Sequence, residues 1–147
     1  MAKKKKEERP LNYNEEIRKL KSEGPGRLYL LWGPEDYLRE LYLKTLRELC
    51  VPDGEDSFSY RRFDGPDLDP RELSDAVDAI PFLTERSFIE LRGVDLNHLD
   101  NAEAVQKVLE DIPDYCTVVF LTGEEPTGKL VKFLRQKGRE IRFTVQD

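Results

Sequence analysis

The sequence predicts one three-layer α/β/α domain built on a mainly parallel five-stranded sheet. Its 147 residues suit a single domain with a sizeable core. Strand-like and helix-like segments alternate along the chain, as they do in successive βαβ units. Two of the strand-like runs, Leu28–Trp32 and residues 118–121, are apolar throughout, which is typical of strands buried on both faces.

The first half of the chain contains two expected helices and two expected strands. An amphipathic helix over residues 14–22 ends at the breaker Gly24-Pro25-Gly26, and the strand Leu28–Trp32 follows. After Gly33-Pro34-Glu35-Asp36, apolar residues at helical spacing predict a helix that runs to about Leu49. Residues 58–63 alternate in polarity and predict a strand with Phe58, Tyr60 and Arg62 on one face.

The second half begins with a strong helix start. Asp69 is a typical N-cap, Pro70 occupies the first helical position and Glu72 lies at the third. This helix is expected to end at Ile80, before Pro81, with its buried face formed by Leu73, Val77 and Ile80. The remaining elements are expected as strand 88–91, helix 102–110, strand 118–121, helix 129–136 and strand 141–145.

The polarity of the strands also predicts their order in the sheet. The two fully apolar strands belong in the middle, and the alternating strands 58–63 and 141–145 suit the edges. Numbered along the chain, the order 5-1-4-3-2 satisfies these preferences. It is the order of the ATPase-like, P-loop-type superfamily that includes clamp loaders, which raises the hypothesis of a nucleotide site.

The expected phosphate-binding turn is degenerate. In this fold the turn after the first strand carries a Gly-Lys-Ser/Thr sequence whose backbone amides hold phosphate. Here the turn is Gly33-Pro34-Glu35-Asp36-Tyr37, which has no lysine, no suitable hydroxyl ligand and one amide fewer at Pro34. Two carboxylates stand where phosphate would bind. We therefore expect no nucleotide cofactor at this turn.

A second loop, Gly123-Glu124-Glu125-Pro126-Thr127-Gly128-Lys129, matches the GxxxxGK spacing. Its next residue, Leu130, cannot bind magnesium, its two glutamates would repel phosphate, and it follows the fourth strand instead of the first. We interpret Gly128 as a loop residue and Lys129 as a helix-surface residue.

Other chemistry-bearing residues form no recognisable constellation. Cys50 and Cys116 are expected to be reduced structural thiols, and His98 has no evident metal or nucleophile partner in the sequence. The spacing of Asp64, Asp67 and Asp69 does not match that of a calcium-binding loop. We expect these aspartates to stabilise turns or to cap a helix. The sequence predicts that the domain has no metal site and no cofactor and that it is not an enzyme.

Charge limits the partners of the domain. The formal net charge is -6, so the body of the domain is a poor general ligand for nucleic acid. The basic run 3–6 is followed by Glu7 and Glu8, and we interpret residues 1–12 as a solvated tail. No segment suits a membrane span or a signal peptide, which predicts a cytoplasmic protein.

The strongest functional feature is the pair Phe82-Leu83, which follows Pro81 on the connection after the helix that ends at Ile80. Two large apolar side chains on a connection are either anchors for a partner's pocket or plugs for the end of the core. The pattern alone leaves both interpretations open.

Several motifs in order along the chain resemble the N-terminal domain of the bacterial DNA polymerase III delta subunit. They are residues 29–38, the turn Phe63-Asp64-Gly65, residues 80–86 and the strand around residues 117–121. The resemblance runs from about Tyr13 to Val145. It implies an ATPase-like fold that has lost its nucleotide site, which agrees with the turn at Gly33.

The resemblance also implies a role in DNA replication, within the DNA-directed DNA polymerase (nucleotidyltransferase) holoenzyme. In this family the first domain binds the beta sliding clamp through a hydrophobic pair, here Phe82 and Leu83 with Ile80 and Pro81 beside them. Family clamp-binding sequences can carry glutamine four residues before the first anchor, where this chain has Asp78. Contact with DNA is expected to be indirect or weak.

The family's full-length subunit continues into lid and collar domains that assemble with the gamma/tau and delta-prime subunits. We expect residues 13–147 to be an isolated first domain that lacks both. Two alternatives stay open: a degenerate nucleotide-binding enzyme that uses the 123–129 loop, and a plain interaction scaffold in which the Phe82-Leu83 pair belongs to the core.

Overall fold

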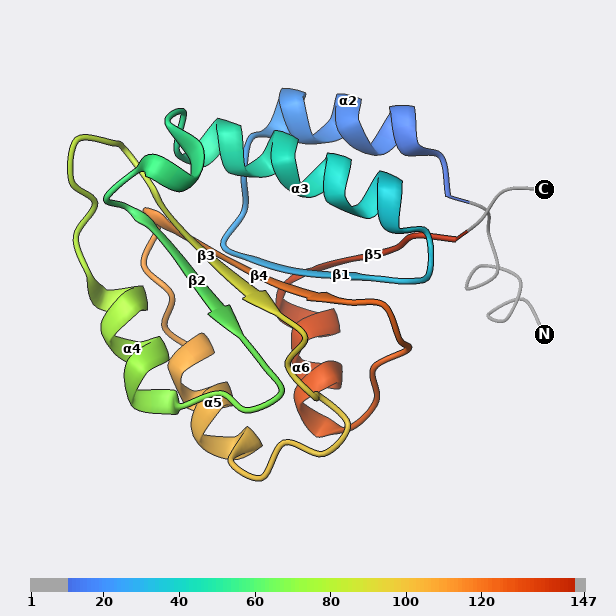
Figure 1. The fold of residues 1–147 in the computed structure, drawn as a ribbon, viewed down its shortest axis with the longest axis vertical. Helices are drawn as coiled ribbons and strands as arrows, with labels where there is room; N and C mark the ends of the chain where they lie inside the picture. Colours follow the sequence, from blue (N-terminus) through green and yellow to red (C-terminus); the bar gives the residue numbers. More distant parts are fainter. Residues whose placement is uncertain (1–10, 145–147) are drawn as a thin grey trace.

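A computed structural model describes residues 11–144, in which a central sheet is covered by helices on both faces (Figure 1). The strands are β1 (Leu28–Trp32), β2 (Tyr60–Asp64), β3 (Ser87–Arg92), β4 (Cys116–Thr122) and β5 (Arg139–Arg142). Every neighbouring pair is parallel, and the order is β2-β3-β4-β1-β5. The predicted fold class and strand order are therefore confirmed.

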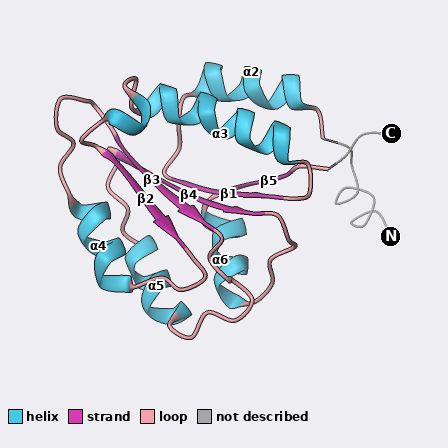
Figure 2. Cartoon of the chain, in the orientation of Figure 1, coloured by secondary structure: helices cyan, strands magenta, loops and turns pink. Residues whose placement is uncertain are grey.

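The helices form two groups, one on each face of the sheet (Figure 2). The first group is α2 (Tyr13–Glu23) and α3 (Asp36–Cys50), and the second is α4 (Pro70–Asp78), α5 (Ala102–Leu109) and α6 (Lys129–Lys137). A short 3-10 turn, η1 (Gly54–Asp56), follows α3. Among the described helices, none has the length and apolarity that a bilayer span requires.

Alternation along β1 divides the core in two. Leu28, Leu30 and Trp32 pack with the helices α4, α5 and α6, whereas Tyr29 and Leu31 pack with α2 and α3. Successive side chains of a strand point to opposite faces, so a strand that is apolar throughout supplies both cores at once. All five residues of β1 are buried, as the sequence predicted.

The helix before the Phe82-Leu83 pair ends earlier than expected. Its N-terminus is as predicted, with the Asp69 side chain accepting a hydrogen bond from the amide of Arg71 at 2.9 Å. However, α4 stops at Asp78, and Ala79 is already extended, with ψ 132°. A residue before proline is excluded from the helical region, so Pro81 forces Ile80 out of the helix. Ile80 is consequently 82% exposed, and its predicted place on the buried face is wrong.

The second strand also starts later than expected, at Tyr60. The turn-forming segment around η1 continues through Ser57, whose hydroxyl accepts a hydrogen bond from the amide of Ser59 at 3.0 Å. Phe58 therefore precedes the strand and is 79% exposed, so its predicted place on a strand face is wrong.

The last strand lies two residues before its expected position. It pairs Tyr29 with Arg139 and Trp32 with Arg142, directly after Gly138 ends α6. Charged side chains are tolerated there because β5 is an edge strand. They also have hydrogen-bond partners, since Glu140 accepts hydrogen bonds from Trp32 and Arg135 at 2.7 and 2.8 Å. The expected end of this strand at Val145 lies outside the described residues, as does most of the expected tail.

A polar network lies beneath α3. Glu90, on β3, is fully buried and accepts hydrogen bonds from Arg47, Tyr60 and Arg92 at 2.9, 3.0 and 2.5 Å. Arg92 in turn binds Glu40 of α3 through two hydrogen bonds at 2.8 and 2.6 Å. The buried carboxylate thus has two cationic partners, which offsets much of the cost of removing it from water. The network fixes α3 to β2 and β3.

Candidate partner-binding surface

The Phe82-Leu83 pair lies on the loop of residues 79–86, which joins α4 to the start of β3 (Figure 1). This loop is at the amino-terminal end of the parallel strands. The turn after β1, where related folds hold phosphate, is at the opposite, carboxyl-terminal end. The two predicted functional regions are therefore separated by the length of the sheet.

The apolar side chains of this loop point into solvent. Leu83 is 81% exposed, Phe82 is 59% exposed, and Pro81 is half-buried. Their exposure excludes the interpretation that the pair plugs the core. Phe58, from the segment before β2, joins them, and we call Phe58, Ile80, Phe82 and Leu83 the apolar patch.

Phe58 and Phe82 make the contact that joins the two segments of the patch. Their ring centroids are 5.8 Å apart with an interplanar angle of 76°, an edge-to-face arrangement. Sequence reasoning missed Phe58 because it assigned that residue to the strand. The turn-rich sequence Pro52-Asp53-Gly54 just before it was a signal that the strand begins later.

Ser59 holds the backbone of the loop. Its hydroxyl accepts a hydrogen bond from the amide of Phe82 at 2.9 Å and donates to the carbonyl of Phe82 at 3.2 Å. The hydroxyl of Thr84 lies 2.8 Å from both Ser59 Oγ and the carbonyl oxygen of Arg86. Leu83, between these two fixed residues, has φ 63°, a left-handed conformation that leucine rarely adopts.

Both ends of the loop are also attached to the body of the domain. The Tyr115 hydroxyl donates to the carbonyl of Asp78 at 3.2 Å, at the end of α4. The Arg86 guanidinium donates to the carbonyl of Gly26 at 3.2 Å and to the hydroxyl of Thr117 at 3.0 Å. The exposed side chains therefore stand on a backbone with defined anchor points. Asp78 is exposed.

At the opposite end of the sheet, the turn after β1 offers few free amides. The amide of Gly33 donates to the carbonyl of Thr122 at 3.2 Å, and that of Glu35 donates to the carbonyl of Phe143 at 3.1 Å. The Glu35 side chain caps α3 by accepting from the amide of Leu38 at 3.3 Å. A carboxylate of the protein thus occupies the helix N-terminus, the place where nucleotide-binding turns receive phosphate.

Polar groups of the loop of residues 123–129 are likewise hydrogen-bonded within the protein. The Asn97 side chain accepts hydrogen bonds from the amide and the hydroxyl of Thr127 at 2.6 and 3.1 Å. The amide of Glu124 donates to the hydroxyl of Thr122 at 3.3 Å. Lys129 is exposed at the first position of α6, as predicted. Glu124, Glu125 and Asp95 line the neighbouring surface depression, which makes it unfavourable for an anion.

The other residues considered in the sequence are spread over the domain. Cys50 and Cys116 are free and buried, and burial raises the pKa of both thiols. His98 is exposed, with its Nδ1 3.2 Å from the Asp95 carboxylate. Asp64 pairs with Arg62, while Asp69 caps α4. Within residues 11–144, no three such side chains cluster in a way that could hold a metal ion.

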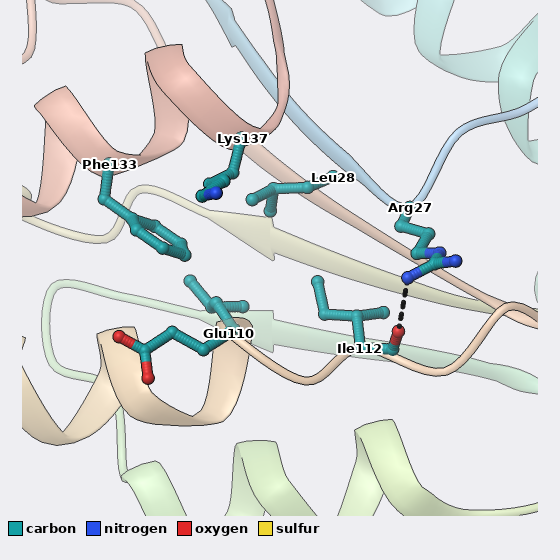
Figure 3. Close-up of a pocket in the computed structure, with 7 residues that line it drawn as sticks. Arg27, Leu28, Glu110, Ile112, Phe133 and Lys137 are labelled. Atoms are coloured by element: carbon teal, nitrogen blue, oxygen red, sulfur yellow. Dashed lines mark hydrogen bonds between the residues drawn. The ribbon is translucent and has the colours of Figure 1, made fainter.

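A separate depression of about 530 Å³ lies between the end of α5, the end of α6 and the start of β1 (Figure 3). The Arg27 guanidinium reaches across it to the carbonyl of Ile112 at 3.4 Å. The residues that line it mix apolar and charged side chains but include no hydroxyl, thiol or imidazole: Arg27, Leu28, Leu109, Glu110, Ile112, Phe133 and Lys137.

The five-stranded parallel sheet, with helices on both faces and a turn after β1 that lacks the phosphate-binding residues, defines a clamp-loader-like α/β domain. The family model of the DNA polymerase III delta subunit matches residues 29–144. The chain therefore belongs to the DNA polymerase III delta subunit family, a family of DNA replication. A comparison with curated protein sequences found no match.

Two solved structures share the fold at low sequence identity. A DNA clamp loader delta protein from Bacillus subtilis aligns with a TM-score of 0.78 and 18% identity over 90% of this chain and 42% of its own. A DNA polymerase III gamma subunit-related protein from Thermotoga maritima aligns with a TM-score of 0.61 and 20% identity, over 92% of this chain and 46% of its own. The chain thus spans less than half the length of either protein.

Proposed function

We propose that this domain binds the beta sliding clamp through the apolar patch and helps to open the ring for loading onto primed DNA. The observation that carries the proposal is the exposure of Phe82 and Leu83 on a loop whose backbone is fixed by hydrogen bonds. Exposed aromatic and aliphatic anchors that enter a pocket dominate many protein interfaces. A fixed backbone lowers the entropy that is lost on binding.

Ring opening then follows from linkage between binding and conformation. If the domain binds the open form of the clamp more tightly than the closed ring, it shifts the population toward the open form. The domain needs no chemical step of its own for this. We infer that it neither binds nor hydrolyses ATP, because the amides of Gly33 and Glu35 and the N-terminus of α3 already have protein partners.

ATP would act in other subunits, by exposing or covering the apolar patch. In this proposal the gamma/tau and delta-prime subunits contact lid and collar domains outside this chain, in the cytoplasm. Contact between this acidic domain and DNA would be indirect or weak, in keeping with its net charge of -6.

The direct test is a binding measurement between this chain and its cognate beta sliding clamp, made with the wild type and with the Phe82→Ala/Leu83→Ala variant. We expect the variant to lose at least about 2 kcal/mol, or roughly thirtyfold in affinity, with an unchanged melting curve. Tyr37→Ala is the matched control, because Tyr37 is 73% exposed at the start of α3, at the other end of the sheet. Equal affinity of the variant and the wild type would refute the proposal.

A further inference from the structure

Among the described residues, the hydroxyl of Ser59 is the one polar group that contacts residues on both sides of Leu83. It contacts the amide and the carbonyl of Phe82 at 2.9 and 3.2 Å, and the hydroxyl of Thr84 at 2.8 Å. Ser59 comes from the segment before β2, so the loop that carries the anchors is fastened to a different part of the chain. We propose that Ser59 is a positioning residue of the clamp-binding surface.

The backbone of Ser59 is itself fixed to the sheet. Its carbonyl accepts a hydrogen bond from the amide of Phe88 at 2.9 Å, beside the β2–β3 pairing that begins at Tyr60. Its amide donates to the hydroxyl of Ser57 at 3.0 Å. The residue is 7% exposed, so water competes little for its hydroxyl. A rigid element of the sheet thereby sets the position of the Phe82 backbone.

The conformation of Leu83 needs such support. Its φ of 63° is unfavourable for a leucine, and an exposed side chain receives little packing energy in return. With Phe82 and Thr84 both held by one hydroxyl, the chain has to turn outward at Leu83. Because Thr84 Oγ1 has a single proton, it donates at any one time either to Ser59 Oγ, which ties Thr84 to Phe82 across Leu83, or to the carbonyl of Arg86, which does not.

Without the Ser59 hydroxyl, the loop would populate conformations in which Phe82 and Leu83 no longer project together. Apparent affinity falls in proportion to the fraction of molecules that are competent to bind. The inference rests on the proposed function, since it concerns the same surface. It adds a residue that does not touch the partner but determines how the anchors are presented.

The test combines Ser59→Ala, Ser59→Thr and Thr84→Val with measurements of clamp affinity and of amide hydrogen exchange in the free chain. We expect Ser59→Ala to weaken clamp binding about five- to tenfold and to accelerate exchange at the Phe82 amide, with exchange in β4 unchanged. Ser59→Thr keeps the hydroxyl and should restore both properties. Thr84→Val should produce a smaller loss in the same direction.

A double-mutant cycle that combines Ser59→Ala with Phe82→Ala distinguishes a positioning role of Ser59 from general destabilisation of the domain. In the Phe82→Ala background Ser59→Ala should cost less than it does in the wild type, because one of the two side chains that it positions is gone. Additive losses, or wild-type affinity of Ser59→Ala despite faster exchange at Phe82, would overturn the inference. If Ser59→Ala does not fold, wild-type affinity of Thr84→Val would also overturn it. Wild-type affinity of Phe82→Ala/Leu83→Ala would instead reject the proposed function.

Discussion

Phe58 meets Phe82 edge to face, with ring centroids 5.8 Å apart, although the two residues belong to connections before different strands. Both rings are mostly exposed, at 79% and 59%, so their contact stabilises the fold little. It supports the Phe82 ring from the side and enlarges the apolar patch. Phe58 is thus part of the surface that we propose for the clamp.

We therefore expect Phe58→Ala to lower clamp affinity about two- to twelvefold, because an aromatic pair is worth about 0.5–1.5 kcal/mol. Titration of the clamp with the variant measures this, and thermal unfolding should show no change. Tyr37→Ala again serves as the control, since Tyr37 is equally aromatic and 73% exposed. An unchanged affinity for Phe58→Ala would limit the contact surface to residues 80–83.

Glu90 should be essential for stability. Its carboxylate is fully buried between Arg47, Arg92 and Tyr60, and removing one member of a buried ionic group leaves the others unpaired. We expect Glu90→Ala to lower the free energy of unfolding by about 3–5 kcal/mol, measured by urea denaturation. Glu48→Ala, at an exposed position of α3, should change it by less than about 0.5 kcal/mol. Equal stability of the two variants would contradict this interpretation.

Gly33 should not tolerate a side chain. It has φ 130°, and a Cβ atom there would lie 2.2 Å from the carbonyl oxygen of Phe143. We expect Gly33→Ala to destabilise the domain by at least about 2 kcal/mol, since both the backbone and its neighbour would have to move. At Gly123 the nearest atom to a new Cβ is the Arg39 guanidinium at 4.0 Å, so Gly123→Ala is the matched control. Similar melting temperatures for the two variants would show that the turn can rearrange.

The chain should not bind nucleotide. Calorimetric titration with ATP and magnesium should give no saturable heat, because protein groups occupy the amides of Gly33, Glu35 and Thr127. Lys129→Ala should behave as the wild type in the same titration. Saturable binding that Lys129→Ala abolishes would instead support the alternative in which the 123–129 loop is a phosphate site.

Because of Tyr60, the free energy of unfolding should depend on pH in the alkaline range. Burial and the neighbouring Glu90 carboxylate raise the pKa of Tyr60 to about 12, from about 10 in the unfolded chain. A raised pKa in the folded state means that the contribution to stability is complete below about pH 10 and is lost as the pH rises toward 12. The difference in urea midpoint between the wild type and Tyr60→Phe should shrink from about pH 9 to pH 11. A constant difference would show that the pKa of Tyr60 is the same in the folded and the unfolded chain.

The fold and the order of its strands could be predicted from residue type and spacing. Runs such as Leu28–Trp32 are apolar on both faces, and only a central strand between two helical layers can bury them. The sequence also determined that the turn at Gly33 lacks the residues of a phosphate site. These properties are local, because residue type and spacing carry them directly.

The folded structure was needed to show that the Phe82-Leu83 pair is exposed and not buried. Whether a side chain on a connection is exposed depends on which distant segments cover it, and spacing along the chain does not encode that. The same holds for Ser59 and Phe58, which reach Phe82 from another connection, and for Glu90, whose burial depends on arginines from α3 and β3. Such contacts arise from packing between elements, so their partners become identifiable only when the sheet and its helices are in place.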